Sequence, residues 1–372
     1  MDKRFLSFIL FSAVAAQGWC ADTLAFRCRQ IENWAFYGTQ NPTVELVAKN
    51  MRGLPQHMQV ECNILAHDAT PLYSLKQKSA VNPKDSVELS FAFMTMQPGF
   101  YTAQFKSGGK DVKSVNIAYE PQKISSVKDK GANGEEFKMF ANLVALERKQ
   151  IRPQFSIIKN RLYSGRQKNV YNFKMVSKAD EAVEGYIAFP AGKKNLPVMI
   201  TLVEEQERAA NVLADFTAPS DMVELVVYIG KRGEGKECVR NMVTDILLSL
   251  DFVAQREETD CGRIHIQGKG AAGACALLCG ALDSRISVSF VSDPDFTLYS
   301  NYFAMASIME DIKQTVVMGM GLQQSASLLQ ENFEVYNSIS ANKEYFVFPD
   351  KSTVERNRWK QIKDMFLQRK GK

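Results

Sequence analysis

A glycine-rich turn between a buried strand and a helix is the part of the chain whose residues and spacing could do chemistry. The run Ile264-His265-Ile266-Gln267-Gly268-Lys269-Gly270-Ala271-Ala272-Gly273 leaves an apolar strand and opens a helix that extends to Leu282. Turns of this kind serve two chemistries. One binds the pyrophosphate of a dinucleotide at the helix N-terminus. The other exposes a serine nucleophile on a G-x-S-x-G turn.

The turn matches the dinucleotide-binding fingerprint literally. Gly268, Gly270 and Gly273 satisfy G-x-G-x-x-G, and Asp293 lies twenty residues beyond Gly273, where an acid that binds ribose would stand. The surroundings fit poorly, because this fingerprint usually opens its domain, whereas several strands precede it here. We therefore keep a dinucleotide-binding protein acting through Gly268–Gly273 as an alternative only, and we expect no cofactor.

The segments around the turn resemble a family of serine esterases. Four motifs carry the resemblance at matching spacing: Asp251-Phe252, Asp260-Cys261-Gly262-Arg263-Ile264, Gly268–Gly273 and Ala281-Leu282-Asp283-Ser284-Arg285. They are similar to motifs of the acetylxylan esterase and cephalosporin C deacetylase family, which is carbohydrate esterase family seven of the α/β-hydrolase superfamily. That family has a G-G-S-Q-G-G turn where this chain has Gly268–Gly273.

The resemblance continues towards both ends of the chain. It includes Gly321-Leu322-Gln323-Gln324 with Phe333 and Tyr336-Asn337, then Lys343-Glu344 with Val347-Phe348-Pro349, and Asn116-Ile117-Ala118-Tyr119-Glu120-Pro121. The last stretch is similar to the one that joins an N-terminal β domain to the catalytic domain in some members. The resemblance implies an α/β fold, with an α/β-hydrolase domain whose mostly parallel sheet has helices on both faces.

Carried over residue by residue, the same resemblance removes the catalytic groups. The nucleophilic Ser of the family falls on Gly270, and its triad Asp falls on Gln324. Its His falls near Thr353, and its oxyanion turn falls near Val203-Glu204. No His follows His265 in the sequence.

Each change removes a different part of the chemistry. Glycine at 270 has no oxygen with which to form an acyl-enzyme, and Gln324 cannot stabilise an imidazolium. Glu204 would place negative charge where a tetrahedral oxyanion needs hydrogen-bond donors. The resemblance therefore implies a degenerate member with no intact catalytic residue.

These observations favour a secreted, acetylxylan-esterase-like pseudoenzyme that binds carbohydrate or a protein partner, and a homo-oligomer is compatible with them. Two alternatives stay open. The first is an active carbohydrate esterase, or deacetylase, with a non-standard site. The second is a relocated site that uses Glu204, Glu205 and Asp293, because paired carboxylates can perform glycosidase-type chemistry.

Residues 22–120 have the pattern of a β domain. Short alternating runs are separated by turn signals such as Pro98-Gly99 and Gly108-Gly109, which predicts an N-terminal β-sandwich. The predicted strands lie at 44–47, 58–65, 86–93, 99–105 and 112–119.

Residues 121–159 are predicted to form a linker and a helix at 135–150, and residues 160–372 the hydrolase domain. Strands and helices alternate in that domain, which is typical of a mostly parallel sheet covered on both faces. The predicted strands are 170–175, 185–189, 198–203, 223–229, 263–267, 286–291, 315–320 and 345–348, and further helices are expected at 242–252, 332–339 and 356–367.

The first 21 residues are predicted to be a signal peptide. Lys3 and Arg4 precede an apolar stretch from Phe5 to Ala16, which is too short to span a membrane. Trp19 before Cys20 argues against a lipoprotein. We therefore expect a secreted or periplasmic protein with no membrane span.

Charge and ligand residues exclude other classes. The net charge is +5 without a basic block, which argues against nucleic acid as a partner. The three His residues lack metal-ligand spacing, so we expect no metal site. An oxidising compartment would permit the disulfides Cys28–Cys62 and Cys238–Cys261.

Overall fold

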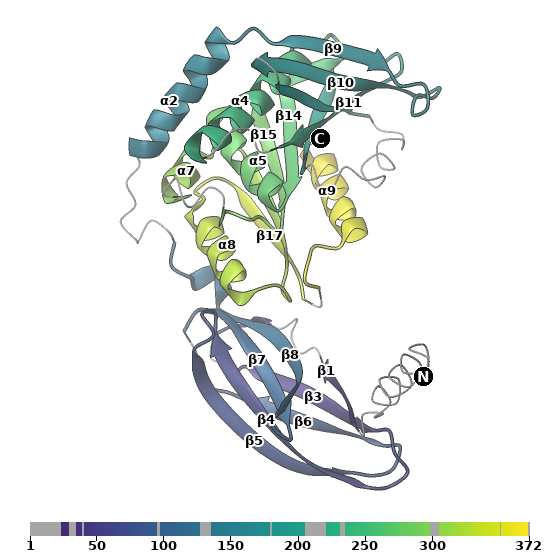
Figure 1. Ribbon diagram of the computed structural model, residues 1–372, viewed down its shortest axis with the longest axis vertical. Coiled ribbons are helices and arrows are strands. Elements are labelled where there is room, and N and C mark those ends of the chain that lie inside the picture. The colour runs from purple at the N-terminus through teal and green to yellow at the C-terminus, as the bar shows by residue number, and fades with distance from the viewer. Residues whose placement is uncertain are drawn as a thin grey trace, which may run out of the picture. The chain divides into compact units, whose positions relative to one another are not determined.

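The chain forms two compact units, residues 1–120 and 121–372 (Figure 1). The structure is a computed structural model. It describes residues 24–29, 35–38, 41–94, 97–126, 135–178, 181–204, 221–230, 235–297, 305–349 and 351–370. The predicted signal peptide, including Cys20, lies outside the described residues, and so does Glu205.

The N-terminal unit contains two sheets. The first has three strands in the order β1 (Leu24–Arg29), β3 (Thr43–Asn50) and β6 (Ser86–Ala92). The second has five strands in the order β2 (Ala35–Phe36), β8 (Lys110–Tyr119), β7 (Gly99–Ser107), β4 (Gln56–Ala66) and β5 (Pro71–Val81). Neighbouring strands are antiparallel except β2 and β8.

Alternation builds the core of this unit, because successive side chains of a strand point to opposite faces. Val60, Cys62 and Ile64 of β4 are fully buried, whereas most of the residues between and beside them reach solvent. The rings of Phe91 on β6 and Phe105 on β7 meet edge to face, 5.7 Å apart, so the two sheets share apolar contacts. Assignment of residues 22–120 to the β-sandwich class stays a prediction.

The C-terminal unit is built on one nine-stranded mixed sheet. Its order is β17 (Lys343–Phe348), β16 (Thr315–Gly321), β15 (Ile286–Ser292), β14 (Thr259–Lys269), β12 (Leu196–Glu204), β13 (Val223–Ile229), β11 (Glu181–Pro190), β10 (Lys168–Lys178) and β9 (Gln154–Lys159). The strands from β17 to β13 in that order run parallel, and β11, β10 and β9 add antiparallel partners.

Helices cover both faces of this sheet. Two neighbouring residues of β15, which point to opposite faces, each contact a different helix. Phe290 of β15 packs against Phe366 of α9 (Arg356–Lys370), at a ring distance of 5.8 Å. The next residue, Val291, lies instead against Gly273 of α5 (Ala271–Leu282). The other described helices are α2 (Glu135–Gln150), α4 (Gly235–Ala254), α7 (Met305–Asp311) and α8 (Ala326–Ser338). Strands β15 and β16 are buried almost throughout, as expected of parallel strands covered on both sides.

The permitted disulfides are absent from the described part of the chain. Cys28, Cys62, Cys238, Cys261, Cys275 and Cys279 are all free thiols. The suggested disulfides Cys28–Cys62 and Cys238–Cys261 are therefore wrong. Spacing along the sequence does not fix the geometry that a disulfide requires.

Within the described residues, no helix combines the length and the apolar content needed to cross a bilayer.

Candidate functional site

The turn between β14 and α5, hereafter the elbow (Lys269–Ala271), has the sharp geometry of a nucleophile turn. Gly270 is the N-cap of α5 with φ 59° and ψ −131°, a conformation that L-residues with a side chain rarely adopt. Its N–H donates to the Ser292 carbonyl at 3.1 Å, and its carbonyl accepts from Asp295 N at 3.0 Å. The elbow is therefore fixed to the neighbouring strand end, but no side chain projects from its apex.

Glutamate 204 occupies the space above the elbow. It ends β12, which runs parallel and next to β14, so the two strand ends lie side by side. The carboxylate oxygen Oε1 accepts a hydrogen bond from Ala271 N at 3.0 Å. A Cβ added at Gly270 would lie only 2.9 Å from the same oxygen. The carboxylate thus binds the helix N-terminus, where negative charge is favoured, and it would have to shift to make room for a side chain at 270.

Two other positions of the expected triad lie at the same edge of the sheet. Gln324 follows β16 and is half-buried, and Thr353 lies exposed in the turn before α9. Because β14, β15, β16 and β17 are parallel, their carboxyl ends meet at one edge. Gln324 and Thr353 therefore lie near that edge, and their assignment to triad positions stays a prediction; an amide and an exposed hydroxyl do not supply an acid and an imidazole.

Asp293 ties these strand ends together. Its carboxylate accepts from Gly321 N at 2.8 Å and from Val354 N at 2.6 Å, so it joins the ends of β15, β16 and the turn that leads to α9. The side chain is buried, and burial raises the pKa of Asp293 above its usual value. Sequence reasoning considered Asp293 only as a ribose ligand or a relocated catalyst. Its φ of 42° is the structural sign of a constrained turn that the sequence did not reveal.

The geometry also accounts for the glycines that imitate a dinucleotide fingerprint. A Cβ at Gly268 would lie 2.3 Å from the Ala272 carbonyl oxygen, so close packing of β14 against α5 requires glycine there. The N-terminus of α5 already holds the Glu204 carboxylate, where a pyrophosphate would have to bind. Asp293 is committed to backbone donors, which leaves little support for a ribose contact or for a carboxylate pair with Glu204.

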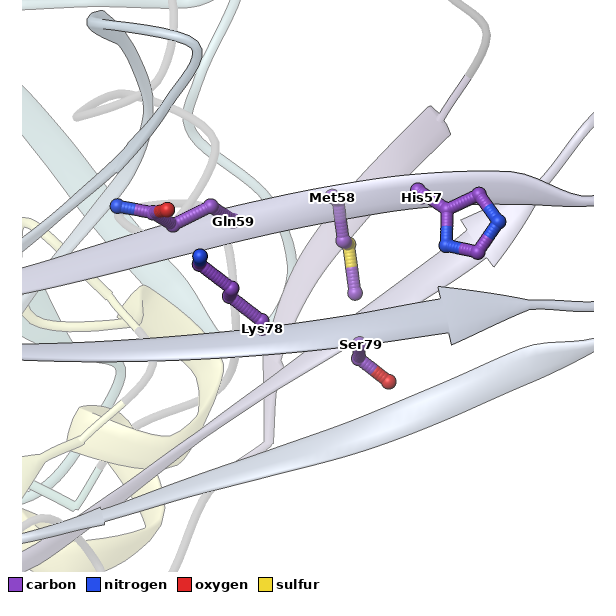
Figure 2. Close-up of a pocket in the computed structure, with 5 residues that line it drawn as sticks. All are labelled: His57, Met58, Gln59, Lys78 and Ser79. Atoms are coloured by element: carbon purple, nitrogen blue, oxygen red, sulfur yellow. The ribbon is translucent and has the colours of Figure 1, made fainter.

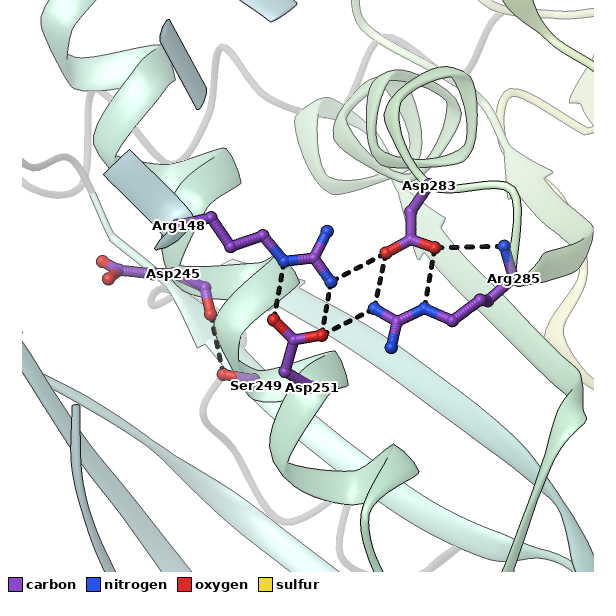
Figure 3. A network of polar contacts seen from close by, with 6 residues as sticks. All are labelled: Arg148, Asp245, Ser249, Asp251, Asp283 and Arg285. Atoms are coloured by element: carbon purple, nitrogen blue, oxygen red, sulfur yellow. Dashed lines mark hydrogen bonds and ion pairs between the residues drawn. The ribbon is translucent and has the colours of Figure 1, made fainter. Parts of the chain in front are cut away.

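The motif residues around the elbow form a scaffold instead of a reaction site. Arg148 of α2 binds Asp251 of α4 through Nε at 2.6 Å and through Nη2 at 2.5 Å, and Nη2 also contacts Asp283 at 2.9 Å (Figure 3). Arg285 binds Asp251 and Asp283, both at 2.7 Å. This four-residue group, hereafter the ion-pair network, connects α2, α4 and the end of α5. Figure 3 also shows Ser249, whose hydroxyl donates to the Asp245 carbonyl at 2.8 Å.

Electrostatics agree with a structural role for the network. Burial alone would raise the pKa of Asp251, but hydrogen bonds from Arg148 and Arg285 outweigh it and hold that pKa below its usual value. The pKa of Asp283 is lowered in the same way, with the bond from Arg285 opposing burial. Both carboxylates are therefore permanently ionised near neutral pH and are poorly suited to act as acids.

Motifs nearer the C-terminus are structural as well. The Lys343 ammonium donates to the carbonyls of Tyr336, Asn337 and Ile339, which closes the C-terminal end of α8. The Asn337 amide donates to the carbonyl of Pro121 at 3.2 Å and to that of Ile124 at 2.9 Å. The resemblance therefore rests largely on residues that hold the fold.

One serine–histidine contact lies away from the elbow. The Ser287 hydroxyl is 2.9 Å from His265 Nδ1, and it is also 2.9 Å from the Ile264 carbonyl, to which it donates. Because a hydroxyl has one proton, donation to the carbonyl leaves Ser287 as an acceptor towards the ring. The contact thus fits a satisfied buried histidine better than an activated nucleophile.

A shallow hollow of about 440 Å³ lies on the N-terminal unit, over β4 and β5 (Figure 2). It is lined by His57, Met58, Gln59, Lys78 and Ser79. Its imidazole, amide, ammonium and hydroxyl groups can donate or accept hydrogen bonds, but the hollow has no aromatic wall. Sequence reasoning missed this feature, because the groups come from two strands and share no motif.

Comparison with solved structures gives the fold. The chain is similar to an acetyl xylan esterase from Paenibacillus sp. R4, with a TM-score of 0.55 and 17% identity over 63% of this chain and 94% of that one. It is also similar to acetyl xylan esterase 1 from Thermoanaerobacterium sp. JW/SL YS485, with a TM-score of 0.54 and 15% identity over 62% of this chain and 92% of that one. The C-terminal unit, with its mixed sheet and its helices, has a fold similar to that of these esterases.

No protein-family model matches the chain, and no curated protein matches it. At these identities the likeness concerns the fold alone, so the chemistry of the chain has to be argued from its own residues.

Proposed function

We propose that this α/β-hydrolase chain is a catalytically inactive, acetylxylan-esterase-like protein with a binding role. The observation that carries the proposal is the Glu204 carboxylate, which is bound to Ala271 N and fills the space over Gly270. An active esterase needs a serine oxygen at the elbow apex and N–H donors free to bind an oxyanion.

The contact with Ala271 bears directly on that requirement. In α/β-hydrolases the N–H of the residue after the nucleophile forms part of the oxyanion hole. Here Ala271 follows the apex, and its N–H is 3.0 Å from a carboxylate oxygen. A second anion at this place would meet a negative charge at contact distance, so formation of a tetrahedral intermediate is opposed.

Retention of the scaffold supports a role for the fold without the reaction. Asp251, Asp283 and Arg285 keep the ion-pair network, while positions 270, 324 and 353 carry a glycine, an amide and an exposed threonine. A role in holding the fold accounts for the first group and does not need a triad. We propose that the elbow edge or the hollow over β4 and β5 binds carbohydrate or a protein partner, in a secreted or periplasmic location.

The test of inactivity is an esterase assay with two substrates and a covalent probe. Purified protein is incubated with p-nitrophenyl acetate and with acetylated xylo-oligosaccharide, and separately with a fluorophosphonate. Rates equal to those of heat-unfolded protein, with no labelled serine, are the expected result.

If the protein hydrolyses either substrate faster than the heat-unfolded control does, and the Gly270→Ala variant keeps this activity, an active carbohydrate esterase with a non-standard site is favoured instead. Fluorophosphonate labelling of Ser287 that disappears in Ser287→Ala would locate such a site.

The binding role is tested separately by calorimetric titration with xylo-oligosaccharides, comparing the wild-type protein with the Lys78→Ala variant. Heat of binding that is lost in this variant favours the hollow over β4 and β5.

A further inference from the structure

The exposed apolar side chains of the C-terminal unit are concentrated in one stretch of chain. Its described residues include seven large apolar side chains that are exposed, and six belong to α2, β9 and the turn after β9: Met139, Leu143, Leu146, Phe155, Ile158 and Leu162, with Met365 as the seventh. Ile158 is 65% exposed and Leu162 is 82% exposed. On β9 itself, Phe155 and Ile158 point to opposite faces of the sheet, so both faces of this strand expose an apolar side chain.

The strand in this stretch, β9, ends the nine-stranded sheet. It pairs with β10 on one side, and among the described residues no strand pairs with its other edge. Natural edge strands are usually protected by central charges, prolines or bulges. From Gln154 to Ile158 this strand has no charge and no proline; Pro153 precedes it, and Lys159 is its last residue.

We propose that β9 pairs with β9 of a second copy of this chain, in antiparallel orientation about a two-fold axis perpendicular to the sheet. The pairing joins two sheets into one continuous sheet. The proposal is independent of whether the chain is an esterase.

Side-chain faces select the register of this pairing. Phe155 and Ile157 pair with Met175 and Phe173 of β10, and the Phe155 ring stacks on Phe252 of α4 at 4.4 Å, so they point to the α4 face. A two-fold axis perpendicular to the sheet keeps each face on its own side, so only residues of the same face can stand opposite each other. Centring the axis on Ser156 places Phe155 opposite the partner's Ile157 twice.

This register is self-complementary. Aromatic and β-branched side chains directly opposite each other stabilise an antiparallel pair, whereas like charges opposite each other destabilise it. Gln154 then faces Ile158 and the small Ser156 faces its own copy, so no two charged residues of β9 are opposed. A register centred on Ile157 would place Lys159 opposite Phe155, which is a poorer match.

The ion-pair network places α2 on the same side of the joined sheet in both copies. Arg148 of α2 binds Asp251 of α4, and Phe155 stacks on the same helix, so α2 and Phe155 share the α4 face. The exposed stripe of Met139, Leu143 and Leu146 therefore accompanies β9 in each copy, as expected for an isologous interface.

An experiment that introduces a like charge at the centre of β9, in the full chain, tests the pairing. Ser156 is exposed and lies opposite Lys174 of β10, so Ser156→Lys brings four positive charges together across the two-fold axis. Light scattering and sedimentation are expected to show a dimer for the wild-type protein and a monomer for Ser156→Lys. The matched control Ser114→Lys changes an exposed strand serine of the N-terminal unit and is expected to stay dimeric.

Mixing separates a lost interface from a lost fold. Ser156→Lys mixed with Ser156→Glu is expected to give a mixed dimer, because opposite charges then face each other, and an unfolded variant could not be rescued in this way. A wild-type protein that is monomeric would overturn the proposal. The same holds if that monomer binds an extended peptide along β9. A dimer that persists in Ser156→Lys, or a mixture that fails to associate, would overturn it too.

Discussion

Gly270 and Glu204 depend on each other. The glycine leaves room for a carboxylate that a side chain would displace, and the carboxylate accepts a hydrogen bond from the Ala271 N–H at the start of α5. Two replacements that look independent in the sequence are therefore one arrangement in space.

A double-mutant cycle measures this dependence. Gly270→Ala is expected to lower the free energy of unfolding by about 2 kcal/mol, because a Cβ at φ 59° is strained and because it meets Glu204 Oε1. In the Glu204→Ala background the same substitution is expected to cost less, since only the backbone strain remains. Denaturant unfolding of the four proteins gives the coupling energy, and costs that simply add would contradict the contact.

Asp293 offers a second prediction. Asp293→Ala is expected to lower the free energy of unfolding by about 3 kcal/mol, because it leaves the N–H groups of Gly321 and Val354 without their acceptor. Hydrogen exchange should show faster exchange at those two amides. Asp295→Ala is a nearby control, because within the described part of the chain its carboxylate accepts from the exposed Thr297 N. Equal losses in the two variants would refute the role given to Asp293.

At the level of elements, the ion-pair network fixes α2 and α4 to the end of α5. The folded-state pKa values of Asp251 and Asp283 are lowered, so their contribution to stability is present above the unfolded-state pKa of about 4 and is lost as pH falls through the folded-state values. We expect the free energy of unfolding to decrease as the solution is acidified below about pH 4.

The variant Asp283→Asn tests the origin of that loss. It is expected to be less stable than the wild-type protein at pH 7 and to show a smaller decrease on acidification. Urea unfolding from pH 7 to pH 3 supplies both quantities. If the free energy of unfolding of the variant falls with pH as steeply as that of the wild-type protein, the acid sensitivity arises elsewhere in the chain.

Elements with one clear apolar period could be predicted from the sequence. The helix that ends at Leu282 and the buried strands of the C-terminal unit coincide with α5, β15 and β16 because packing on two faces leaves long apolar runs. Strands β5 and β9 were missed because they are edge strands, with both faces largely exposed and therefore no alternation to detect.

The candidate site could be predicted only as positions along the chain. The resemblance named Gly270, Gln324 and Thr353, which follow β14, β16 and β17 in the structure, and the parallel order of β14 to β17 puts those strand ends at one edge. The contact between Glu204 and Ala271 could not be predicted, because it depends on the side-by-side register of β12 and β14 and on a side-chain conformation.

At the scale of the whole molecule, the two units have separate cores. Phe105 is fully buried in the N-terminal unit and Phe290 is fully buried in the C-terminal unit. Because each core is enclosed by its own strands, we expect two unfolding transitions in calorimetry. Phe105→Leu should lower one midpoint and Phe290→Leu the other, each by removing packed ring atoms at a cost of about 1 to 3 kcal/mol. A shift of both midpoints by either variant would contradict this.

The carboxylate over the elbow also limits how the chain could change. Serine at 270 meets Glu204 Oε1, and removal of Glu204 alone leaves the apex without an oxygen. No histidine follows His265 that could activate a restored hydroxyl. A serine nucleophile at this turn would therefore need three things together: a serine at 270, a shifted Glu204 carboxylate and a histidine brought from elsewhere in the chain.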